Sequence, residues 1–503
     1  MLVACAVWAA MPAVLRAQSV AMVPCSSEGV ERQHCPADTA AGVTLSRVTG
    51  DAACLLGKTW GYDDQGIWVL GGCSAEFVVA DKSGGNAGET QSSTLVVPPE
   101  DKYQPVQTWS QFEPGKGFLI GRTKIGEVSI SAYLLIRYIN QLPPDESFRD
   151  HLGRTHEIDA RHDIYSHRVM VFLKGWLGIP KFRYQIILWT VNTTDQKALF
   201  GNLGYQFHRA FSLYAGMNAL PGTRSLQGSH PYWLAPDRVM ADEYFRPFFT
   251  NGIWATGEVI DGLWYNAMVG NNLSALGITA NQLTRDFAYA GSIWWMPTTH
   301  EFGPQGAYGD WEQHTAVATR FGVSGTHSRE DRFSDLATGN PDNTTVRLAD
   351  SLLLFDLGAL APDVTVQRAN VSLLAADAGM KYRGLFLQAE YYNRWLNKFQ
   401  ADGALPVKLI HDTGFYVQAA FYPWAKRIEL YTATSQIFGD KQAGYGHSEE
   451  YLGGLNLYFG NTRNLRLNLQ GIYVNRSPVS STFGYYVGGL DGAVLSAAVS
   501  AFF

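Results

Sequence analysis

Four cysteines lie close together in the first part of the chain, and they define the first chemistry to consider. They are Cys25, Cys35, Cys54 and Cys73, whereas the remaining cysteine, Cys5, lies in an apolar N-terminal stretch. Four cysteines within about 50 residues of an exported chain predict two disulfides, for which three pairings are possible. A zinc site with four cysteine ligands is the alternative, but none of the four stands in a C-x2-C pair. The spacing therefore favours disulfides and leaves their pairing open.

Basic side chains form the second group of interest, because they recur on the polar faces of segments in which polar and apolar residues alternate. Arginines and lysines that line a passage attract anions. Acids among them, such as Glu390 and Glu429, can instead pair with them across strands and stiffen a wall. Both interpretations stay open. The basic candidates for lining a pore are Arg137, Arg168, Lys174, Arg183, Arg320, Arg394 and Arg466.

The long stretch 221–249 carries charges of both signs and is too long to be a simple turn. Loops of this size in compact proteins are usually functional, although their functions differ. We expect either a constriction in which acids oppose bases, or an exterior cap or subunit contact. The charged candidates in this stretch are Arg224, Arg238, Asp242, Glu243 and Arg246.

Sequence motifs of enzymes and of metal or nucleotide sites are absent. The chain has no H-E-x-x-H, C-x-x-C, G-x-S-x-G or G-x-x-x-x-G-K-[ST] sequence. We therefore expect no enzyme activity, no catalytic residue, no cofactor and no metal. The net charge of −6 gives no general attraction for nucleic acid, so no nucleic-acid partner is expected.

The elements that must position these side chains are strands. In the segment NLRLNLQGIYVN, Leu465, Leu467 and Leu469 alternate with polar residues, and alternation of period two predicts a β-strand. A soluble barrel or sandwich would bury the apolar face. A transmembrane barrel would turn that face to lipid and line a pore with the polar face.

Two features favour the transmembrane barrel. Aromatic residues stand near segment ends, as in SIWWMPTT and AFYPW, where a membrane barrel has its interfacial girdles. Connections also fall into two classes, so we expect short turns on one rim and long loops on the other. The tight connections are 179–181, 258–262 and 425–426, and the long polar ones are 140–163, 221–247, 299–313 and 328–345.

The strand count follows from the same alternation. Bacterial single-chain barrels have an even number of strands, so we expect an all-β fold with a transmembrane antiparallel barrel of 16 strands, with 18 as the alternative. An even number also brings both ends of the barrel to the periplasmic side. The candidate segments are 117–123, 128–139, 166–177, 181–192, 198–208, 211–220, 250–260, 263–272, 285–298, 314–327, 346–356, 364–376, 379–397, 413–424, 427–439, 448–460, 465–477 and 492–503.

Composition divides the chain into four parts. The apolar start is too short for a spanning helix and ends on an Ala-x-Ala-like sequence, which predicts a signal peptide over 1–17; a buried first helix is the alternative. Residues 18–80 are expected to form a small disulfide-rich periplasmic β module. Gly, Ser, Pro and charged residues dominate 81–114, which predicts a linker, and 115–503 form the barrel.

The cysteine-containing part resembles a small bacterial secreted domain of uncharacterised function. The resemblance is carried by W-G-Y-D at 60–63, G-I-W-V at 66–69 and the G-C-x-A-E-F sequence that includes Cys73. It implies a short-stranded β module with cystines and implies no activity. Trp60, Tyr62 and Trp68 are expected either to form the core of the module or to offer a surface on which sugars stack.

The rest of the chain resembles the bacterial porins related to the phosphate-selective O and P type. The resembling stretches are DRVMADEYFRP and GEVIDGLWYNAMVGNNL. The resemblance implies an outer-membrane homotrimer with inward-folded loops, which forms a water-filled channel for small hydrophilic solutes or ions, with anions such as phosphate among the candidates. The alternative is a plugged or structural barrel whose module contacts cell wall or glycan.

The final stretch, GAVLSAAVSAFF, places Leu495, Val499 and Phe503 on one face of a strand. We expect that apolar face to meet outer-membrane lipid. The strand must also pair with the first strand and close the barrel, because an open edge in lipid would leave backbone groups unsatisfied. A terminal aromatic residue on the last strand resembles the signal read by the barrel assembly machinery. Phe503 is therefore the candidate assembly signal.

Overall fold

The computed structural model describes two compact units, residues 1–102 and 103–503, which are taken separately below. The signal peptide expected at 1–17 and the linker expected at 81–114 lie outside the described residues. The described residues are 21–27, 29, 31–39, 42–50, 52–79, 117–142, 146–191, 196–228, 230–274, 286–332, 345–479 and 487–503.

The first unit contains two three-stranded antiparallel sheets. Trp60 and Phe77 meet in its core with ring centroids 4.8 Å apart, and Ile67 is fully buried beside them. The first sheet has the order β1 (Ala21–Ser26), β6 (Ser74–Val79), β3 (Val43–Val48), and the second has the order β2 (Gln33–Cys35), β5 (Gly66–Val69), β4 (Trp60–Asp63).

Two disulfides hold this small unit together, and their pairing is one of the three that the sequence allowed. Cys25 is bonded to Cys35, and Cys54 is bonded to Cys73. The first bond joins β1 to β2, and the second ties the segment before β4 to the start of β6. Such a small core gains much of its stability from cross-links.

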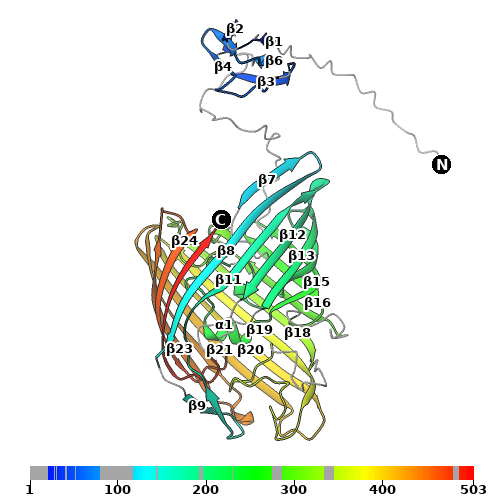
Figure 1. The fold of residues 1–503 in the computed structure, drawn as a ribbon. Helices are drawn as coiled ribbons and strands as arrows, with labels where there is room; N and C mark the ends of the chain where they lie inside the picture. Colours follow the sequence, from blue (N-terminus) through cyan, green and yellow to red (C-terminus); the bar gives the residue numbers. More distant parts are fainter. Residues whose placement is uncertain are drawn as a thin grey trace, which may run out of the picture. The chain divides into compact units, whose positions relative to one another are not determined.

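The second unit is a closed antiparallel barrel of 16 strands (Figure 1). Each strand pairs with the next one along the chain, and β25 pairs with β8 to close the ring. The strands are β8 (Gly126–Gln141), β11 (His162–Leu177), β12 (Ile179–Val191), β13 (Gln196–His208), β14 (Phe211–Ala219), β15 (Phe249–Ile260), β16 (Leu263–Gly270), β17 (Ala288–Trp295), β18 (Ala318–Asp331), β19 (Val366–Tyr382), β20 (Leu385–Ala401), β21 (Leu409–Trp424), β22 (Ile428–Phe438), β23 (His447–Tyr458), β24 (Leu465–Asn475) and β25 (Gly492–Phe502).

Two of the expected segments are not strands of the ring. Residues 117–123 contain β7 (Phe118–Thr123), which pairs only with the first part of β8, from Ile130 to Gly126. Residues 346–356 form a connection with a single bridge between Arg347 and Leu353. Leu348, Leu354 and Phe355 of that connection are buried in one core with inward-facing residues of the wall, so these apolar residues mark packing rather than a strand face.

Alternation along the strands separates an apolar outer face from a mixed inner face. On β8, Leu134 and Ile136 are 39% and 44% exposed, whereas Leu135 and Arg137 are fully buried. The same pattern recurs on β25, where Leu495 is exposed and its neighbours are buried. The outer faces of these strands are therefore mainly apolar, and charged side chains such as Arg137 point inward.

Both ends of the ring lie at one rim, which we call the C-terminal rim, because β8 begins there and β25 ends there. Short turns at 178, 261–262 and 425–427 lie on this rim, close to the tight connections expected at 179–181, 258–262 and 425–426, although residues 179–181 belong to β12 and 258–260 to β15. The expectation for 299–313 was wrong. This long connection follows β17 and therefore also leaves from the C-terminal rim, instead of joining the other long loops.

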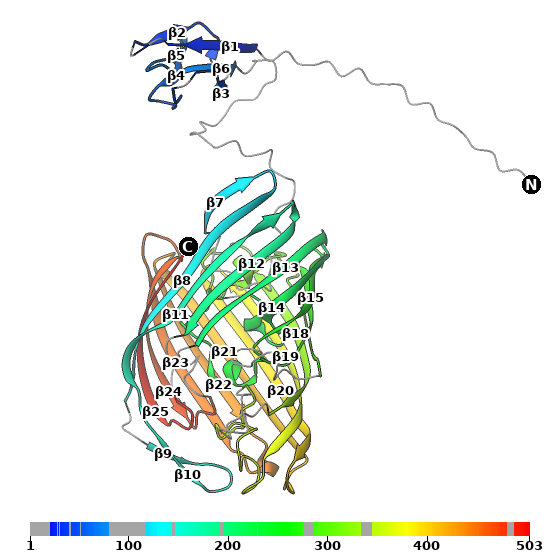
Figure 2. The same cartoon turned by 45° about the vertical axis from the view of Figure 1, so that its right-hand side comes forward.

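Little helix is present in the described residues. The helix α1 (Met240–Phe245) lies inside the ring of strands, and the short hairpin of β9 (Glu146–Arg149) and β10 (Thr155–Ile158) lies at the end away from the C-terminus (Figure 2). Across the part of the chain that the structure describes, no helix has the length and apolar character needed to cross a membrane.

Candidate functional site in the barrel lumen

The connection between β14 and β15 folds into the barrel and fills much of its lumen. We call residues 220–228 and 230–248 the inner segment. Its described residues are buried except Tyr232, Glu243 and Phe248, which are partly buried. Apolar side chains on the inner faces of the wall, such as Phe172 and Ile187, are buried with it in one core. The stretch therefore lies neither outside the barrel as a cap nor at the surface as a subunit contact.

The helix α1 begins against the wall of β22 and β23. Its N-cap residue, Val239, offers no side-chain acceptor, and the first amides of a helix have no partner within the helix. The wall provides the acceptors: the Met240 amide donates to Glu450 Oε2 at 2.9 Å, and the Ala241 amide donates to Ser435 Oγ at 2.7 Å. The start of the helix is thus fixed by residues about 200 positions away.

Three residues before α1, Asp237 holds the inner segment to another part of the wall, β8 and β11, which β24 and β25 separate from β23. Arg137 on β8 and Arg168 on β11 both donate to this carboxylate, and His167 Nε2 lies 3.2 Å from Oδ2. Burial would raise the pKa of Asp237, but the charges of Arg168, His167 and Arg137 hold it well below its usual range. The Asp237 carboxylate is therefore charged at neutral pH.

The end of α1 is held by a third contact, to β20 and β21. The Tyr244 hydroxyl donates to Asp412 Oδ2 at 3.1 Å, and Arg394 donates to the same oxygen at 2.6 Å. The Arg394 guanidinium also lies 4.1 Å from the centre of the Tyr244 ring, a distance at which cation–π attraction operates.

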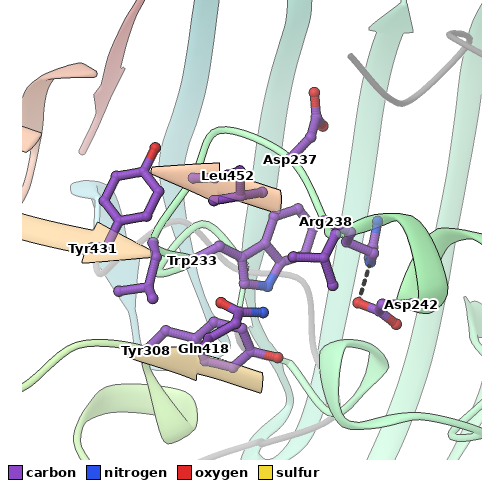
Figure 3. Close-up of a pocket in the computed structure, with 11 residues that line it drawn as sticks. Trp233, Asp237, Arg238, Asp242, Tyr308, Gln418, Tyr431 and Leu452 are labelled. Carbon is purple, nitrogen blue, oxygen red and sulfur yellow. Dashed lines mark ion pairs between the residues drawn. The ribbon is translucent and has the colours of Figure 1, made fainter. Parts of the chain in front are cut away.

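Arg238 points along the inner segment rather than toward the wall (Figure 3). Its Nε donates to Ser225 Oγ at 2.8 Å and lies 3.6 Å from Asp242 Oδ2, and its guanidinium stacks on Trp233 at 4.2 Å. A cavity of about 10 Å³ separates this group from Tyr308 and Tyr431. That volume admits about one water molecule.

A second connection enters the lumen from the C-terminal rim. We call residues 301–314 the rim loop. The Tyr308 amide donates to Tyr232 O at 2.8 Å, and Arg224 donates to Gly306 O. The rim loop therefore meets the inner segment inside the barrel through its own main-chain groups, one bonded to a carbonyl and one to the Arg224 side chain, although the two connections come from opposite rims.

The rim loop has an ionic cluster of its own, centred on His314. His314 Nε2 lies 2.6 Å from Glu301 Oε1, and His314 Nδ1 bonds to Asp310. These two hydrogen bonds, that to Asp310 first, raise the pKa of His314 to about 9. Outside the loop, Lys381 Nζ donates to Phe302 O at 2.7 Å and the Gly384 amide donates to Asp310 at 2.7 Å.

The same loop contains a possible metal-ligand group. Ligand atoms of Asp310, Glu312 and His314 lie within 4.8 Å of one another. Both ring nitrogens of His314 are already hydrogen-bonded to carboxylates, and a metal ligand must present an unprotonated nitrogen. The donor set therefore does not fit a metal ion in this arrangement.

The structure brings most of the predicted pore residues into the lumen and pairs them. Arg320 bonds to Asp377 at 3.0 Å, and Arg466 donates to the carbonyl oxygen of Trp233 at 2.6 Å. Glu243 and Arg246 pair within the inner segment. Their role as pore-lining residues stays a prediction. The predicted residues on inner faces of strands or in the inner segment are Arg137, Arg168, Lys174, Arg183, Arg224, Arg238, Asp242, Glu243, Arg246, Arg320, Arg394 and Arg466.

Lys174 and Arg183 differ from the other basic candidates. They lie on the inner faces of β11 and β12, toward the C-terminal rim, and are partly buried. The inner segment reaches Arg137 and Arg168 on the same part of the wall through Asp237, but these two cations lie further along the strands.

The sequence analysis missed the acids that bind these cations. Asp237, Asp377 and Asp412 are the partners of four of the predicted arginines. Asp377 and Asp412 stand on alternating segments at inner-face positions, so the period-two pattern contained that signal. Asp237 had no such signal, because it lies in a stretch without periodicity.

Phe503 lies beside β7 at the C-terminal rim. Its ring centroid is 4.9 Å from that of Phe118, and its amide donates to Ala132 O at 3.2 Å. The side chain is 40% exposed on the apolar outer face. Its role as an assembly signal stays a prediction.

The aromatic residues of the first unit divide between core and surface. Trp60 is buried, and Tyr62 is exposed. Trp68 is partly buried, with the guanidinium of Arg32 at 4.1 Å from its ring centre and with Gly61 so close to the ring that a Cβ there would clash. Gly61 and Arg32 therefore occupy space that a sugar would need in order to stack on this ring.

Comparisons with known proteins add limited information. A protein-family model described as a protein of unknown function (DUF3011) matches residues 22–100. No curated protein matches the chain significantly.

Several solved porin structures are similar over about three quarters of the chain. The trimer form of OmpT, an outer membrane protein of Vibrio cholerae, is 10% identical with a TM-score of 0.48, covering 75% of this chain and 100% of that one. The anion-selective porin from Comamonas acidovorans is 9% identical, with a TM-score of 0.45 and coverage of 75% and 100%. OmpF of Salmonella typhi is 12% identical, with a TM-score of 0.45 and coverage of 76% and 98%. At these identities and scores the likeness assigns no activity to this chain.

Proposed function

We propose that this chain forms a channel in a bacterial outer membrane, through which small hydrophilic solutes or ions diffuse passively. The observation that carries the proposal is the closed ring of 16 strands with an apolar outer face and a charged inner face. An exposed apolar face of this kind is stable against lipid. A ring of this size is also too wide for the wall side chains alone to fill.

The filling of the lumen fits a channel whose width is set by connections rather than by the wall. The inner segment and the rim loop occupy the lumen, and both are parts of the barrel chain. They are attached through side-chain ion pairs and a few main-chain hydrogen bonds. They also pack in one core with the wall, and none of these attachments replaces a hydrogen bond between wall strands.

The ion preference follows from the pairing of charges. An anion channel needs basic side chains that remain available to the solute, but here Arg137, Arg168, Arg320 and Arg394 each bind an aspartate. We therefore propose a weak charge preference. Phosphate stays a candidate solute on the sequence resemblance alone.

Three further parts of the proposal concern the surroundings of the barrel. The chain would assemble as a homotrimer, would be inserted by the barrel assembly machinery through Phe503, and would hold its disulfide-bonded unit in the periplasm. An oxidising compartment suits that unit, because both of its cystines would persist there.

Planar-bilayer recording of the refolded full chain tests the proposal. We expect stepwise current increases with a linear current–voltage relation, and a reversal potential close to zero in a salt gradient. Bilayers that stay silent at high protein concentration, with protein shown to be folded and inserted, would contradict the channel. A reversal potential close to the value for a pure anion conductor would contradict the weak charge preference.

A further inference from the structure

One carboxylate of the inner segment gathers two arginines and a histidine from the wall. Arg137 donates to Asp237 Oδ2, Arg168 donates to Oδ1, and His167 Nε2 lies 3.2 Å from Oδ2. The side chain of Asp237 is fully buried, and the side chain of Arg168, the most exposed of its three partners, is only 4% exposed. Each oxygen of the carboxylate thus has its own arginine, in the geometry that makes charge-assisted bonds strong.

The other contacts that the structure describes between the inner segment and the wall bring no carboxylate of the segment against a wall cation. The Met240 and Ala241 amides donate to wall side chains, and Arg466 donates to the carbonyl oxygen of Trp233. The Arg224 guanidinium comes no closer than 4.0 Å to Asp377. Asp237 is therefore the acidic residue of the inner segment that forms ion pairs with arginines of the wall.

The position of Asp237 also determines which charges the lumen presents. Arg137 and Arg168 point inward from neighbouring strands, and Arg168 lies opposite Leu135 in the register. With the carboxylate in contact, its charge offsets theirs. Without it, two buried guanidinium groups on adjacent strands would face the lumen without their acid.

We propose that Asp237 is a latch that holds the inner segment across the lumen and, while latched, suppresses the anion preference that Arg137 and Arg168 would otherwise give the channel. Breaking the contact releases the segment from the β8–β11 wall and leaves the two arginines to attract anions. The ion-preference half of this inference rests on the proposed function. The latch itself is a contact within the folded chain and can be tested without conduction.

The central variant is Asp237→Asn, which keeps the shape of the side chain and removes its charge. We expect a higher conductance than the wild type and a reversal potential shifted toward the anion value. Asp150→Asn is the matched control, because Asp150 is also buried and bonds to an arginine and a histidine, Arg154 and His156. Both of those partners belong to the β9–β10 hairpin, so this control should leave conductance and reversal potential unchanged.

Neutralising Arg137 and Arg168 tests the contact with Asp237 and the ion preference separately. In Arg137→Gln/Arg168→Gln the latch is broken but Asp237 keeps its charge, so the reversal potential should shift toward the cation value. Adding Asp237→Asn to this pair removes all three charges, so the reversal potential should return toward that of the wild type while the conductance stays high. A normal heat-modifiable gel mobility shows that each variant is folded, and the wall double variant breaks the same contact if Asp237→Asn does not fold.

Hydrogen exchange of residues 232–241 in refolded protein reports the latch without any current. Removing one partner from a buried charged contact costs enough that exchange should accelerate at least about tenfold in Asp237→Asn, and remain unchanged in Asp150→Asn. Unchanged exchange in Asp237→Asn would overturn the latch. Faster exchange with an unshifted reversal potential would overturn the link to ion preference. If every folded variant exchanges as expected but none conducts, the latch stands and the proposed function fails.

Discussion

The inner segment and the rim loop enter the same lumen from opposite rims, yet they are held in different ways. The inner segment depends on the wall: Asp237 binds Arg137, and Met240 binds Glu450. The rim loop is organised around His314, whose two carboxylate partners belong to the loop itself. The two connections touch through the Tyr308 amide and a carbonyl of the inner segment.

This difference separates two ways of ordering a connection inside a barrel. A connection held by its own residues can form as soon as those residues are near one another in sequence. A connection held by distant wall residues can be ordered only after the wall has closed. We therefore expect single substitutions to disturb the inner segment more strongly than the rim loop.

The largest effect should come from removing each connection in turn. Replacing residues 224–246 by a short Gly/Ser linker should raise the single-channel conductance severalfold, because the inner segment crosses the lumen, from Arg320 on β18, which donates to Gln227, to Arg137 on β8, which donates to Asp237. Replacing 303–312 in the same way should raise it less. Equal increases for the two replacements would contradict the comparison.

A smaller effect is expected when the ion pair of β20 and β21 that binds Tyr244 of the inner segment is broken. Arg394→Met leaves the buried Asp412 carboxylate without its cation, and should lower the free energy of unfolding by about 3 kcal/mol. Arg463→Met, beside the rim loop, should cost about 1 kcal/mol, because Arg463 donates one hydrogen bond to the Tyr308 carbonyl and lies 3.9 Å from a partly exposed Glu312. Urea unfolding of the two variants in lipid vesicles measures the difference.

A pH dependence should distinguish the two connections. The folded pKa of His314, about 9, is raised above its ordinary value of 6.5. Its contribution to stability is therefore complete below pH 6.5 and is lost as the pH rises through about 9. Asp237 has a lowered pKa, so its contact with the wall should not respond in that range.

Limited proteolysis measures this dependence. We expect cleavage of the rim loop to increase between about pH 7 and about pH 9.5 in the wild type, and to be high and nearly independent of pH in His314→Gln. Cleavage within the inner segment should stay constant. A parallel increase in both connections would mean that they are ordered together.

The smallest effect tests the point of contact itself. Because the rim loop meets the inner segment through the Tyr308 main chain, Tyr308→Phe should keep that contact. Its hydroxyl lies 3.5 Å from the Tyr416 hydroxyl, which makes at most a weak hydrogen bond. The loss in unfolding free energy should be about 0.5 kcal/mol or less. A loss comparable to that in Arg394→Met would show that the Tyr308 hydroxyl, through Tyr416 on β21, holds the rim loop more strongly than its main-chain contact does.

The strands of the wall could be predicted because a strand between lipid and lumen must alternate. Segments such as 465–477 show the pattern clearly, and the barrel contains all but two of the expected segments. The failure at 346–356 has a physical cause. Leu348 and Leu354 are apolar because they pack inside the barrel, and a short apolar run does not reveal which side of a wall it will contact.

The lumen could be predicted only in part. Arg137 was placed correctly on the inner face, because its position in the alternating pattern determines its direction. Its partner Asp237 lies 100 residues away in a stretch without any period, and no local pattern encodes such a contact. The disulfides show the same limit: their presence followed from composition, but their pairing depends on how β1 and β2 meet.

The pairing of β7 has a mechanical consequence. Along the edge of β8, residues 133–141 pair with β25, and residues 126–130 pair with β7. A pull applied from the N-terminal side of the chain reaches Phe118 first, at the open end of the β7–β8 hairpin. The force therefore unzips β7 one hydrogen bond at a time, which requires little force, before it loads the seam between β8 and β25. We therefore expect the β7–β8 pairing to break before the β8–β25 pairing when the chain preceding the barrel is under tension, so that the ring stays closed.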